Sequence, residues 1–267
     1  MSDVVRLVIH GAAGRMGQRL VAMSSQDPTW SLVGAVEAPH HPRLGDDAGS
    51  VAGIDPLRVP ISSSVPEQAD VMIDFSSPEG AERAIAAAAA HRLPLVMATT
   101  HLSEASRAEL RRLAEAVPVC WSPSMSLAVN LTMKMAQLCA SALRNHRTGA
   151  DVEIIERHHR FKEDAPSGTA LKFGELIANE MNLDQQAHGR KGLIGKRPKT
   201  EIGYHAVRVG DNPGEHVIVF GMLGETIELR VAASNRDCYA EGALAAARYL
   251  IGRPAGLYSM GDVLGLG

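Results

Sequence analysis

Short runs of aliphatic residues alternate with longer helical patterns through the first 120 residues of the chain. Consecutive positions within each run are apolar, which is typical of strands buried on both faces of a parallel sheet. The helical patterns between the runs would cover those two faces. We expect strands at residues 4–10, 31–38, 71–76, 93–100 and 117–123, and helices at 18–26, 78–92 and 104–116.

The pattern changes in the second half of the chain. A long helical pattern, a strand and a further helix are expected at residues 127–145, 151–157 and 168–181. Three strand-like runs follow with only turn residues between them, at 200–209, 215–223 and 225–234. These runs predict a mixed or antiparallel sheet, and hence a second domain. A closing helix at 239–252 could return to the first domain. The expected domains are therefore residues 1–125 with 236–267, and residues 126–235.

Composition and charge restrict the classes of partner. The net charge of −3 gives no general attraction to nucleic acid or anionic membranes, so any anion site must be local. Aromatic residues make up 4% of the chain, too few for a platform that stacks single-stranded bases. No apolar run approaches the roughly 18 residues of a membrane span, and the N-terminus lacks a signal-peptide pattern. Three widely separated cysteines fit free thiols in a reducing compartment, so we expect a soluble cytoplasmic protein.

A glycine-rich turn lies between the first predicted strand and the first predicted helix. Gly11, Gly14 and Gly17 are spaced three residues apart there. Glycine lets the backbone approach a pyrophosphate closely, and the start of a helix supplies N–H donors. Glu37 ends the second predicted strand, where an acid would bind a ribose hydroxyl. Glycine turns also open helices that bind nothing, but the combination with Glu37 favours a dinucleotide site.

The residues around Glu37 bear on which nicotinamide dinucleotide would bind. Ala38 stands where an arginine would favour the 2′-phosphate of NADPH. Arg15 and Arg43 could still supply positive charge. NADH or NADPH would therefore be the cofactor, and the residues favour NADH.

A cluster of basic residues follows the strand expected at 151–157. It is followed by a Ser-Gly-Thr turn that opens the next helix, whose N–H groups can bind a carboxylate. Histidine and lysine can both donate protons near neutral pH when their surroundings tune them. The stretch therefore predicts an anion pocket with proton donors, although a solvated loop, a simple helix cap or a zinc site are alternatives. The cluster consists of Arg157, His158, His159, Arg160 and Lys162, and the turn of Ser167, Gly168 and Thr169.

Two motifs together resemble one family. The sequence "GAAGRMG" at 11–17 and "EIIERHHRFKEDAPSGTA" at 153–170 look like those of 4-hydroxy-tetrahydrodipicolinate reductases. The resemblance covers the whole chain and includes "IDFSSPEG" and "GLYSMGDVL". It implies a Rossmann-like dinucleotide-binding domain, a second α+β domain with a mixed sheet that binds substrate, and a homotetramer. The implied reaction reduces a small dicarboxylate with NAD(P)H in the diaminopimelate branch of lysine biosynthesis.

The resemblance also implies roles for individual residues. It makes His158 the catalytic acid and Lys162 the second proton donor, with no metal. The substrate carboxylates would be bound by His159, Gly168 and Thr169. The cofactor would be bound by Gly11, Ala12, Ala13, Gly14, Arg15, Met16, Glu37, Ala98, Thr99, Thr100, Ser122, Pro123, Ser124 and Met125.

The chain departs from the family pattern at several positions while keeping His158 and Lys162. His101 replaces a glycine in a turn that needs a positive φ. Two alternatives stay open: a diverged relative that reduces a related cyclic imine, and a dinucleotide-binding sensor without activity. The departures are Ala98, His101, Ser124, Phe161 and Val231.

Overall fold

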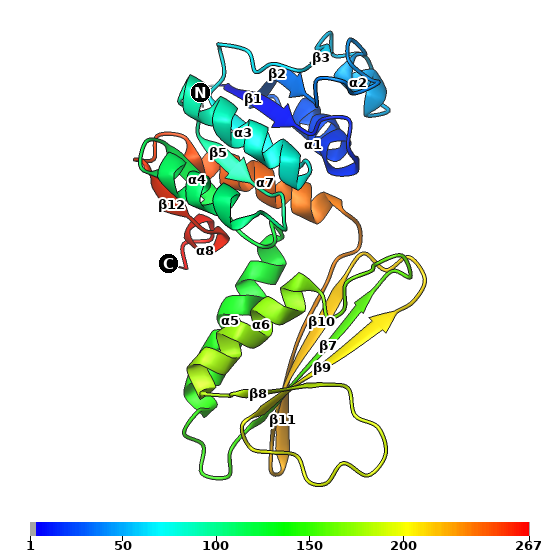
Figure 1. Ribbon diagram of the computed structural model, residues 1–267, viewed down its shortest axis with the longest axis vertical. Helices are drawn as coiled ribbons and strands as arrows, with labels where there is room; N and C mark the ends of the chain where they lie inside the picture. The colour runs from blue at the N-terminus through cyan, green and yellow to red at the C-terminus, as the bar shows by residue number, and fades with distance from the viewer. Residues whose placement is uncertain (1–3, 267) are drawn as a thin grey trace. The chain divides into compact units, whose positions relative to one another are not determined.

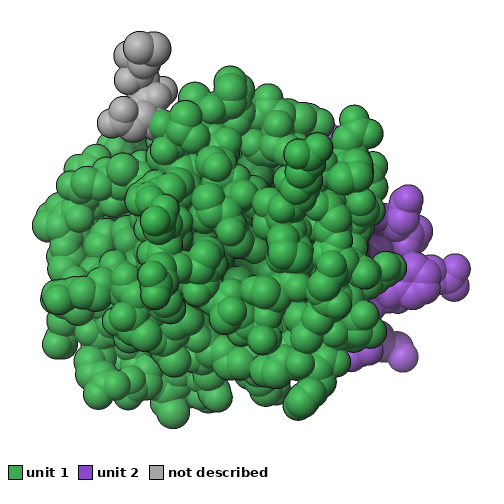
Figure 2. All heavy atoms as spheres, turned by 90° about the horizontal axis from the view of Figure 1, so that it is seen from above, with its two compact units in different colours: residues 1–127, 236–267 green, residues 128–235 purple. Residues whose placement is uncertain are grey.

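The computed structural model describes residues 4–266. The chain forms two compact units, which Figure 2 colours separately. Unit 1 is built from the described residues up to 127 and from those after 235, and unit 2 consists of residues 128–235. The chain therefore leaves unit 1 once, completes unit 2, and returns.

Unit 1 contains a seven-stranded sheet in which every pair of neighbouring strands is parallel. The strand order is β12-β6-β5-β4-β1-β2-β3, so the order reverses at β1. In such sheets ligands bind at the carboxyl ends of the strands beside the reversal. The strands are β1 (Val5–His10), β2 (Trp30–Val36), β3 (Ile61–Ser62), β4 (Val71–Asp74), β5 (Leu95–Met97), β6 (Pro118–Trp121) and β12 (Gly256–Tyr258).

Helices cover both faces of this sheet (Figure 1). One core contains Leu7 and Ile9 of β1 with Leu20 and Ala246 from helices α1 and α7. The opposite face joins Val8 to a second core that contains residues of α3 and α4. The expected parallel sheet with covered faces is therefore confirmed. The helices are α1 (Arg15–Gln26), α2 (Ala48–Val51), α3 (Pro78–His91), α4 (Glu104–Ala114), α7 (Asp237–Leu250) and α8 (Met260–Val263).

Unit 2 contains a five-stranded mixed sheet with two helices on one face (Figure 1). β9 runs parallel to β7 and β8, whereas β10 runs antiparallel to β7 and β11. Ile154, Phe173 and Phe220 are fully buried between sheet and helices. The elements are α5 (Leu127–Leu143), β7 (Asp151–His158), α6 (Gly168–Met181), β8 (Gln185–His188), β9 (Glu201–Arg208), β10 (Glu215–Met222) and β11 (Glu225–Ala232).

The structure adds short elements that the sequence pattern did not predict. They are β3, β8, β12, α2 and α8, each of two to four residues. Such lengths are too short for a period of two or 3.6 residues to be seen. The closing helix α7 does return to unit 1, where it packs against α1, β4, β5 and β6. No helix in residues 4–266 is both long and apolar enough to cross a membrane.

Candidate active site

The residues predicted to bind a dinucleotide meet at one edge of the sheet of unit 1. Gly11 follows β1, Glu37 follows β2, Ala98 follows β5, and Ser122 follows β6. These strands are parallel and neighbouring, so their carboxyl ends lie at the same edge. Residues 11–16, 98–100 and 122–125 therefore share one edge although they are far apart in the sequence.

The glycine turn after β1 is as tight as its sequence indicates. Gly11 has a φ of +81°, and a side chain there would place its Cβ 2.5 Å from the carbonyl oxygen of Phe75. A Cβ on Gly17 would overlap the carbonyl oxygen of Gly11. Both positions therefore require glycine so that strand, turn and helix can approach one another.

Helix α1 begins without a side-chain cap. Gly14 is its N-cap and has no side chain to bind the first N–H groups. Serine hydroxyls cap α3, α4 and α6 instead: Ser77, Ser103 and Ser167. Because an uncapped helix start offers N–H donors and partial positive charge, the turn fits the pyrophosphate of a dinucleotide.

Glu37 lies against the glycine turn. Its Oε1 accepts a hydrogen bond of 2.9 Å from the Ala13 N–H, and its Oε2 accepts one of 3.3 Å from the Ala38 N–H. The carboxylate is thus held next to the turn by backbone donors. A carboxylate here can accept hydrogen bonds from ribose hydroxyls and repels a phosphate.

A buried polar network lies at the same strand ends. Asp74 accepts hydrogen bonds from Thr99 Oγ1 at 2.5 Å and from Ser76 Oγ at 2.6 Å. The Ser76 N–H in turn donates to Thr99 Oγ1 at 2.9 Å. Thr99 is therefore held in place by the end of β4. His101, two residues further on, has a φ of +59°, so the turn does adopt the left-handed conformation expected at this position.

The other predicted residues lie in unit 2, where β7 ends and α6 begins. His158 is the last residue of β7, and only 8% of its surface is exposed. Ser167 is the N-cap of α6, and its Oγ accepts from the Ala170 N–H at 3.1 Å. Gly168 and Thr169 form the first turn of this helix. A Cβ on Gly168 would meet nothing within 4 Å, so there is open space beside this turn.

Glu156 connects these two parts of unit 2. Its Oε2 lies 2.5 Å from Nδ1 of His158, and its Oε1 accepts from the Ser167 N–H at 3.1 Å. Arg208 donates to both oxygens, at 2.8 and 2.7 Å. Burial raises the pKa of Glu156, but the hydrogen bonds from His158 and Arg208 outweigh it and lower that pKa to about 2. Glu156 is therefore a buried, ionised carboxylate.

His216 completes this group of buried side chains. Its Nε2 lies 3.1 Å from Ser167 Oγ, and its ring meets that of His158 edge-on, with 5.3 Å between ring centroids. Burial, and then the charges of His158 and Lys162, lower the pKa of His216 to about 4. His216 is therefore neutral near pH 7 and adds no further charge beside His158.

The remaining members of the cationic cluster separate in space. Lys162 Nζ lies 2.7 Å from Asp164 Oδ1, with its side chain 22% exposed. Arg157 alternates with His158 along the strand and pairs with Glu215 at 3.5 Å. His159 lies against the ring of Phe161, which is 77% exposed. The cluster is thus not one patch of like charges. His158 is paired with Glu156 beneath the turn, and Lys162 and Arg157 have acidic partners of their own.

Three residues of this site were missed by the sequence analysis: Glu156, Arg208 and His216. The sequence did contain a signal for Glu156. Residues two apart on a strand face the same side, and Glu156 is two residues before His158. Arg208 pairs with His158 across β7 and β9, and His216 pairs with Glu156 across β7 and β10. That register is visible only in the folded sheet.

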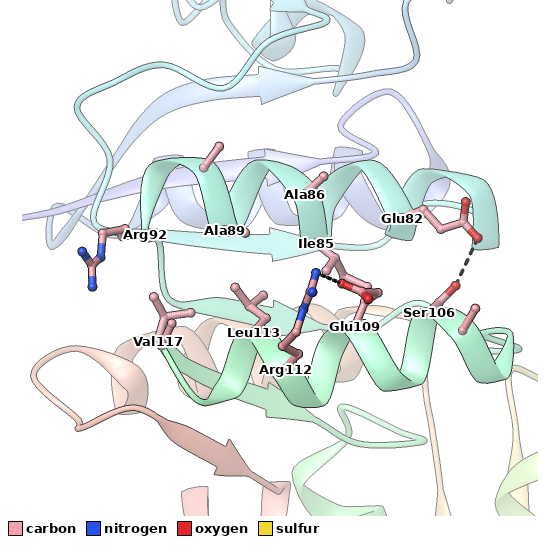
Figure 3. Close-up of a pocket in the computed structure, with 13 residues that line it drawn as sticks. Glu82, Ile85, Ala86, Ala89, Arg92, Ser106, Glu109, Arg112, Leu113 and Val117 are labelled. Carbon is pink, nitrogen blue, oxygen red and sulfur yellow. Dashed lines mark hydrogen bonds and ion pairs between the residues drawn. The ribbon is translucent and has the colours of Figure 1, made fainter.

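A separate pocket of about 840 Å³ lies between α3 and α4 (Figure 3). Helical alanines form much of its wall, and none of the predicted site residues lines it. The pocket is lined by Glu82, Ile85, Ala86, Ala89, Ala90, Arg92, Ala105, Ser106, Glu109, Arg112, Leu113, Ala116 and Val117.

Among residues 4–266, no group of three or more His, Cys, Asp and Glu side chains could hold a metal ion.

Unit 1 has a parallel sheet with an uncapped glycine turn, and unit 2 has a mixed sheet with a buried histidine beside a helix start. Together these features are typical of a dinucleotide-binding oxidoreductase. Family models agree with this class. The model described as "Dihydrodipicolinate reductase, N-terminus" matches residues 5–125, and "Dihydrodipicolinate reductase, C-terminus" matches residues 128–264. The chain belongs to the dihydrodipicolinate reductase family.

Individual relatives give the same result. A 4-hydroxy-tetrahydrodipicolinate reductase of Rhodopirellula baltica is 56% identical over 98% of this chain and 96% of its own length. One from Burkholderia thailandensis is 42% identical over 98% of both chains. A dipicolinate-bound dihydrodipicolinate reductase from Paenisporosarcina sp. TG-14 superposes with a TM-score of 0.74, at 25% identity, over 96% of this chain and 97% of that one. The resemblance and the fold class expected from the sequence are therefore confirmed.

Proposed function

We propose that this chain reduces 4-hydroxy-tetrahydrodipicolinate to tetrahydrodipicolinate with a nicotinamide dinucleotide. Its relatives carry the name of that activity. The observation that carries the proposal is the pairing of His158 with Glu156 next to the start of α6. A proton donor and an N–H anion site are thereby combined, which is what reduction of a dicarboxylate requires.

The reaction consumes a proton together with the hydride. The substrate loses its hydroxyl group, together with a hydrogen of the neighbouring ring carbon, as water, and the reduced cofactor would supply the hydride. His158 donates a proton to the ring carbon next to the site of hydride addition, so that the electron pair displaced by the hydride forms a C–H bond and the product keeps its C=N bond. Its Nδ1 is bound to Glu156, so Nε2 is the nitrogen that would donate. Lys162 is the second donor and assists the loss of water.

The substrate carboxylates bind at the start of α6 in this proposal. The N–H groups of Gly168 and Thr169 are in the first turn of the helix, and His159 lies in the loop before it. The solved relative was obtained with dipicolinate, an aromatic dicarboxylate. The open space beside Gly168 supports binding of such a ligand at this turn.

We propose NADH as the preferred cofactor. The Glu37 carboxylate is held against the glycine turn, where it would bind the ribose hydroxyls and repel the 2′-phosphate of NADPH. Arg43, one of the two arginines that could neutralise that phosphate, is paired with Asp46 at 3.2 Å. The residues of the glycine turn, the 98–100 turn and the 122–125 segment would hold the rest of the cofactor.

We also propose that the chain is a homotetramer assembled through unit 2. Ile155 and Val207 are 36% and 39% exposed. Strand alternation puts them on the sheet face opposite to α5 and α6, together with Val217. Exposed apolar side chains on one sheet face support contact with another copy. Light scattering should give four times the chain mass of 28.4 kDa, and Ile155→Glu should reduce it.

The activity is tested with freshly generated 4-hydroxy-tetrahydrodipicolinate, by following the absorbance of NADH and NADPH separately. We expect oxidation of both, faster with NADH at low concentration, and a loss of at least about 100-fold in His158→Gln. His188→Gln changes an exposed histidine of unit 2 and should keep full activity. A protein that binds NADH but oxidises neither cofactor would exclude this function and favour a related cyclic imine or a sensor.

A further inference from the structure

We propose that Glu156 and Arg208 form a positioning pair that sets which nitrogen of His158 donates the proton and ties this histidine to the anion-binding turn. The inference rests on the proposed function. Neither residue belongs to the groups expected to touch substrate or cofactor. Both act through His158 and Ser167, to which the Glu156 carboxylate is bonded.

The first step of the argument is the completeness of the bonding around Glu156. Only 1% of the residue's surface is exposed, and its two oxygens accept from His158, Ser167 and twice from Arg208. A buried carboxylate is stable only with such partners. Arg208 offers the planar pair of donors that matches a carboxylate, so it supplies both charge and geometry.

The second step concerns the tautomer of His158. An ionised carboxylate can only accept, so Nδ1 of His158 must carry the hydrogen in both charge states of the ring. The catalytic proton must then leave from Nε2.

The third step is the connection to the loop and the helix. Arg208 Nη2 also donates to the carbonyl oxygen of Asp164 at 2.6 Å, and Asp164 holds Lys162. Glu156 holds the backbone of Ser167, the N-cap of α6. One ion pair therefore contacts the histidine, the loop that carries the second donor, and the turn that would bind a carboxylate.

Of the charged groups around His158, Glu156 is the one placed to fix its ring. His216, from β10, faces His158 but is neutral. Lys162 and Asp164 in the loop form their own pair. Arg208 on β9 is directed to Glu156. Among the residues in 4–266, the one acidic side chain in hydrogen-bonding contact with the His158 ring is Glu156.

The test compares Glu156→Gln with Glu153→Gln. Glu153 is on the same strand, on its other face, and also binds two arginines, so it controls for loss of a bonded glutamate. We expect kcat to fall about 100-fold in Glu156→Gln, comparable to loss of a residue that orients a catalytic group. The affinity for NADH should stay unchanged, because Glu156 lies in unit 2 and the predicted cofactor residues lie in unit 1. In Glu153→Gln kcat should stay at the wild-type value.

A Glu156→Gln protein that keeps the wild-type kcat would overturn the proposal. Nitrogen NMR of the His158 ring in the wild-type protein tests it even if this variant does not fold. We expect hydrogen on Nδ1 in the neutral ring, and the Nε2–H tautomer would contradict the proposal. Wild-type protein without reductase activity would instead refute the proposed function, and the NMR result would still decide the position of the hydrogen.

Discussion

Nδ1 of His10 lies 2.6 Å from Oδ1 of Asp74, and the two residues are paired in register across the parallel strands β1 and β4. Both side chains are buried, at 3% and 0% exposure. The pair therefore links the strand that leads into the glycine turn to the strand whose end holds Thr99.

Asp74→Asn should destabilise unit 1. The amide replaces one acceptor oxygen with a donor, so at least one of the donors on His10, Ser76 and Thr99 loses its partner in a buried site. We expect a loss of about 2–4 kcal/mol in the free energy of unfolding, measured with urea. Asp70→Asn removes a partly exposed pair with Arg6 and should cost about 1 kcal/mol or less. Equal losses would contradict the role given to Asp74.

The free energy of unfolding should fall as the pH is lowered from 6.5 to 4, because of His216. Its pKa is about 4 in the folded protein, against 6.5 ordinarily, so in this range the unfolded chain binds a proton that the folded chain does not. The difference corresponds to at most about 3 kcal/mol. In His216→Gln this part of the pH dependence should disappear from the urea midpoints.

A second loss of stability should occur at lower pH. Glu153 and Glu156 have pKa values of about 2 in the folded protein, against 4.5 ordinarily, because hydrogen bonds from arginines and histidines outweigh burial. Their contribution is complete above pH 4.5 and is lost as the pH falls towards 2. The two windows can be separated by measuring unfolding at half-unit steps of pH. A curve that is flat between pH 4.5 and 2 would contradict these assignments.

Gly17→Ala should damage the glycine turn itself. The added Cβ would overlap the carbonyl oxygen of Gly11, so the turn or α1 must move. We expect a loss of about 1–3 kcal/mol in stability and weaker binding of NADH, measured by calorimetry. Unchanged affinity for NADH would show that this turn is not part of the cofactor site.

Gly168→Ala is the matched change in unit 2. Nothing lies within 4 Å of the added Cβ, and alanine favours a helix, so stability should be unchanged or rise by up to about 1 kcal/mol. The methyl group would instead occupy space beside the turn that we assign to a substrate carboxylate. KM for the substrate should rise while the affinity for NADH stays the same. A variant with normal KM would remove Gly168 from the binding site.

His101 should tolerate glycine and reject valine. Its φ of +59° is strained for side chains branched at Cβ. We expect His101→Val to lower stability by about 1–2 kcal/mol, and His101→Gly to change it by less than about 1 kcal/mol. Thermal unfolding of the two variants gives the comparison, and equal melting temperatures would exclude strain at this residue.

The longer strands and helices could be predicted from the sequence, because long buried elements have strong periodic patterns. The strands predicted at 4–10 and 71–76 contain β1 and β4, and the helix predicted at 78–92 contains α3. β8 could not be predicted in this way, since three of its four residues, Gln185–His188, are polar and exposed. It is a strand because β9 lies beside it in parallel register.

The candidate active site could be predicted only where its residues are close together in the sequence. His158, Gly168 and Thr169 fall in one motif, and the structure brings their segments together through Glu156. Arg208 and His216 lie about 50 residues from their partners, and only the pairing of β7 with β9 and β10 brings them close. Local motifs therefore identified the strand end and the helix start, but not the buried residues that connect them.

The order of the two units along the chain has a consequence for synthesis on the ribosome. The helix α7, which packs against α1, β4, β5 and β6, follows unit 2 in the sequence. When residue 235 has been made, unit 2 has all of its residues, while one face of the sheet in unit 1 has α1 but still lacks α7. Unit 2 can therefore form its core first, and the part of the apolar face of unit 1 that α7 covers stays open to other nascent or chaperone proteins until α7 emerges.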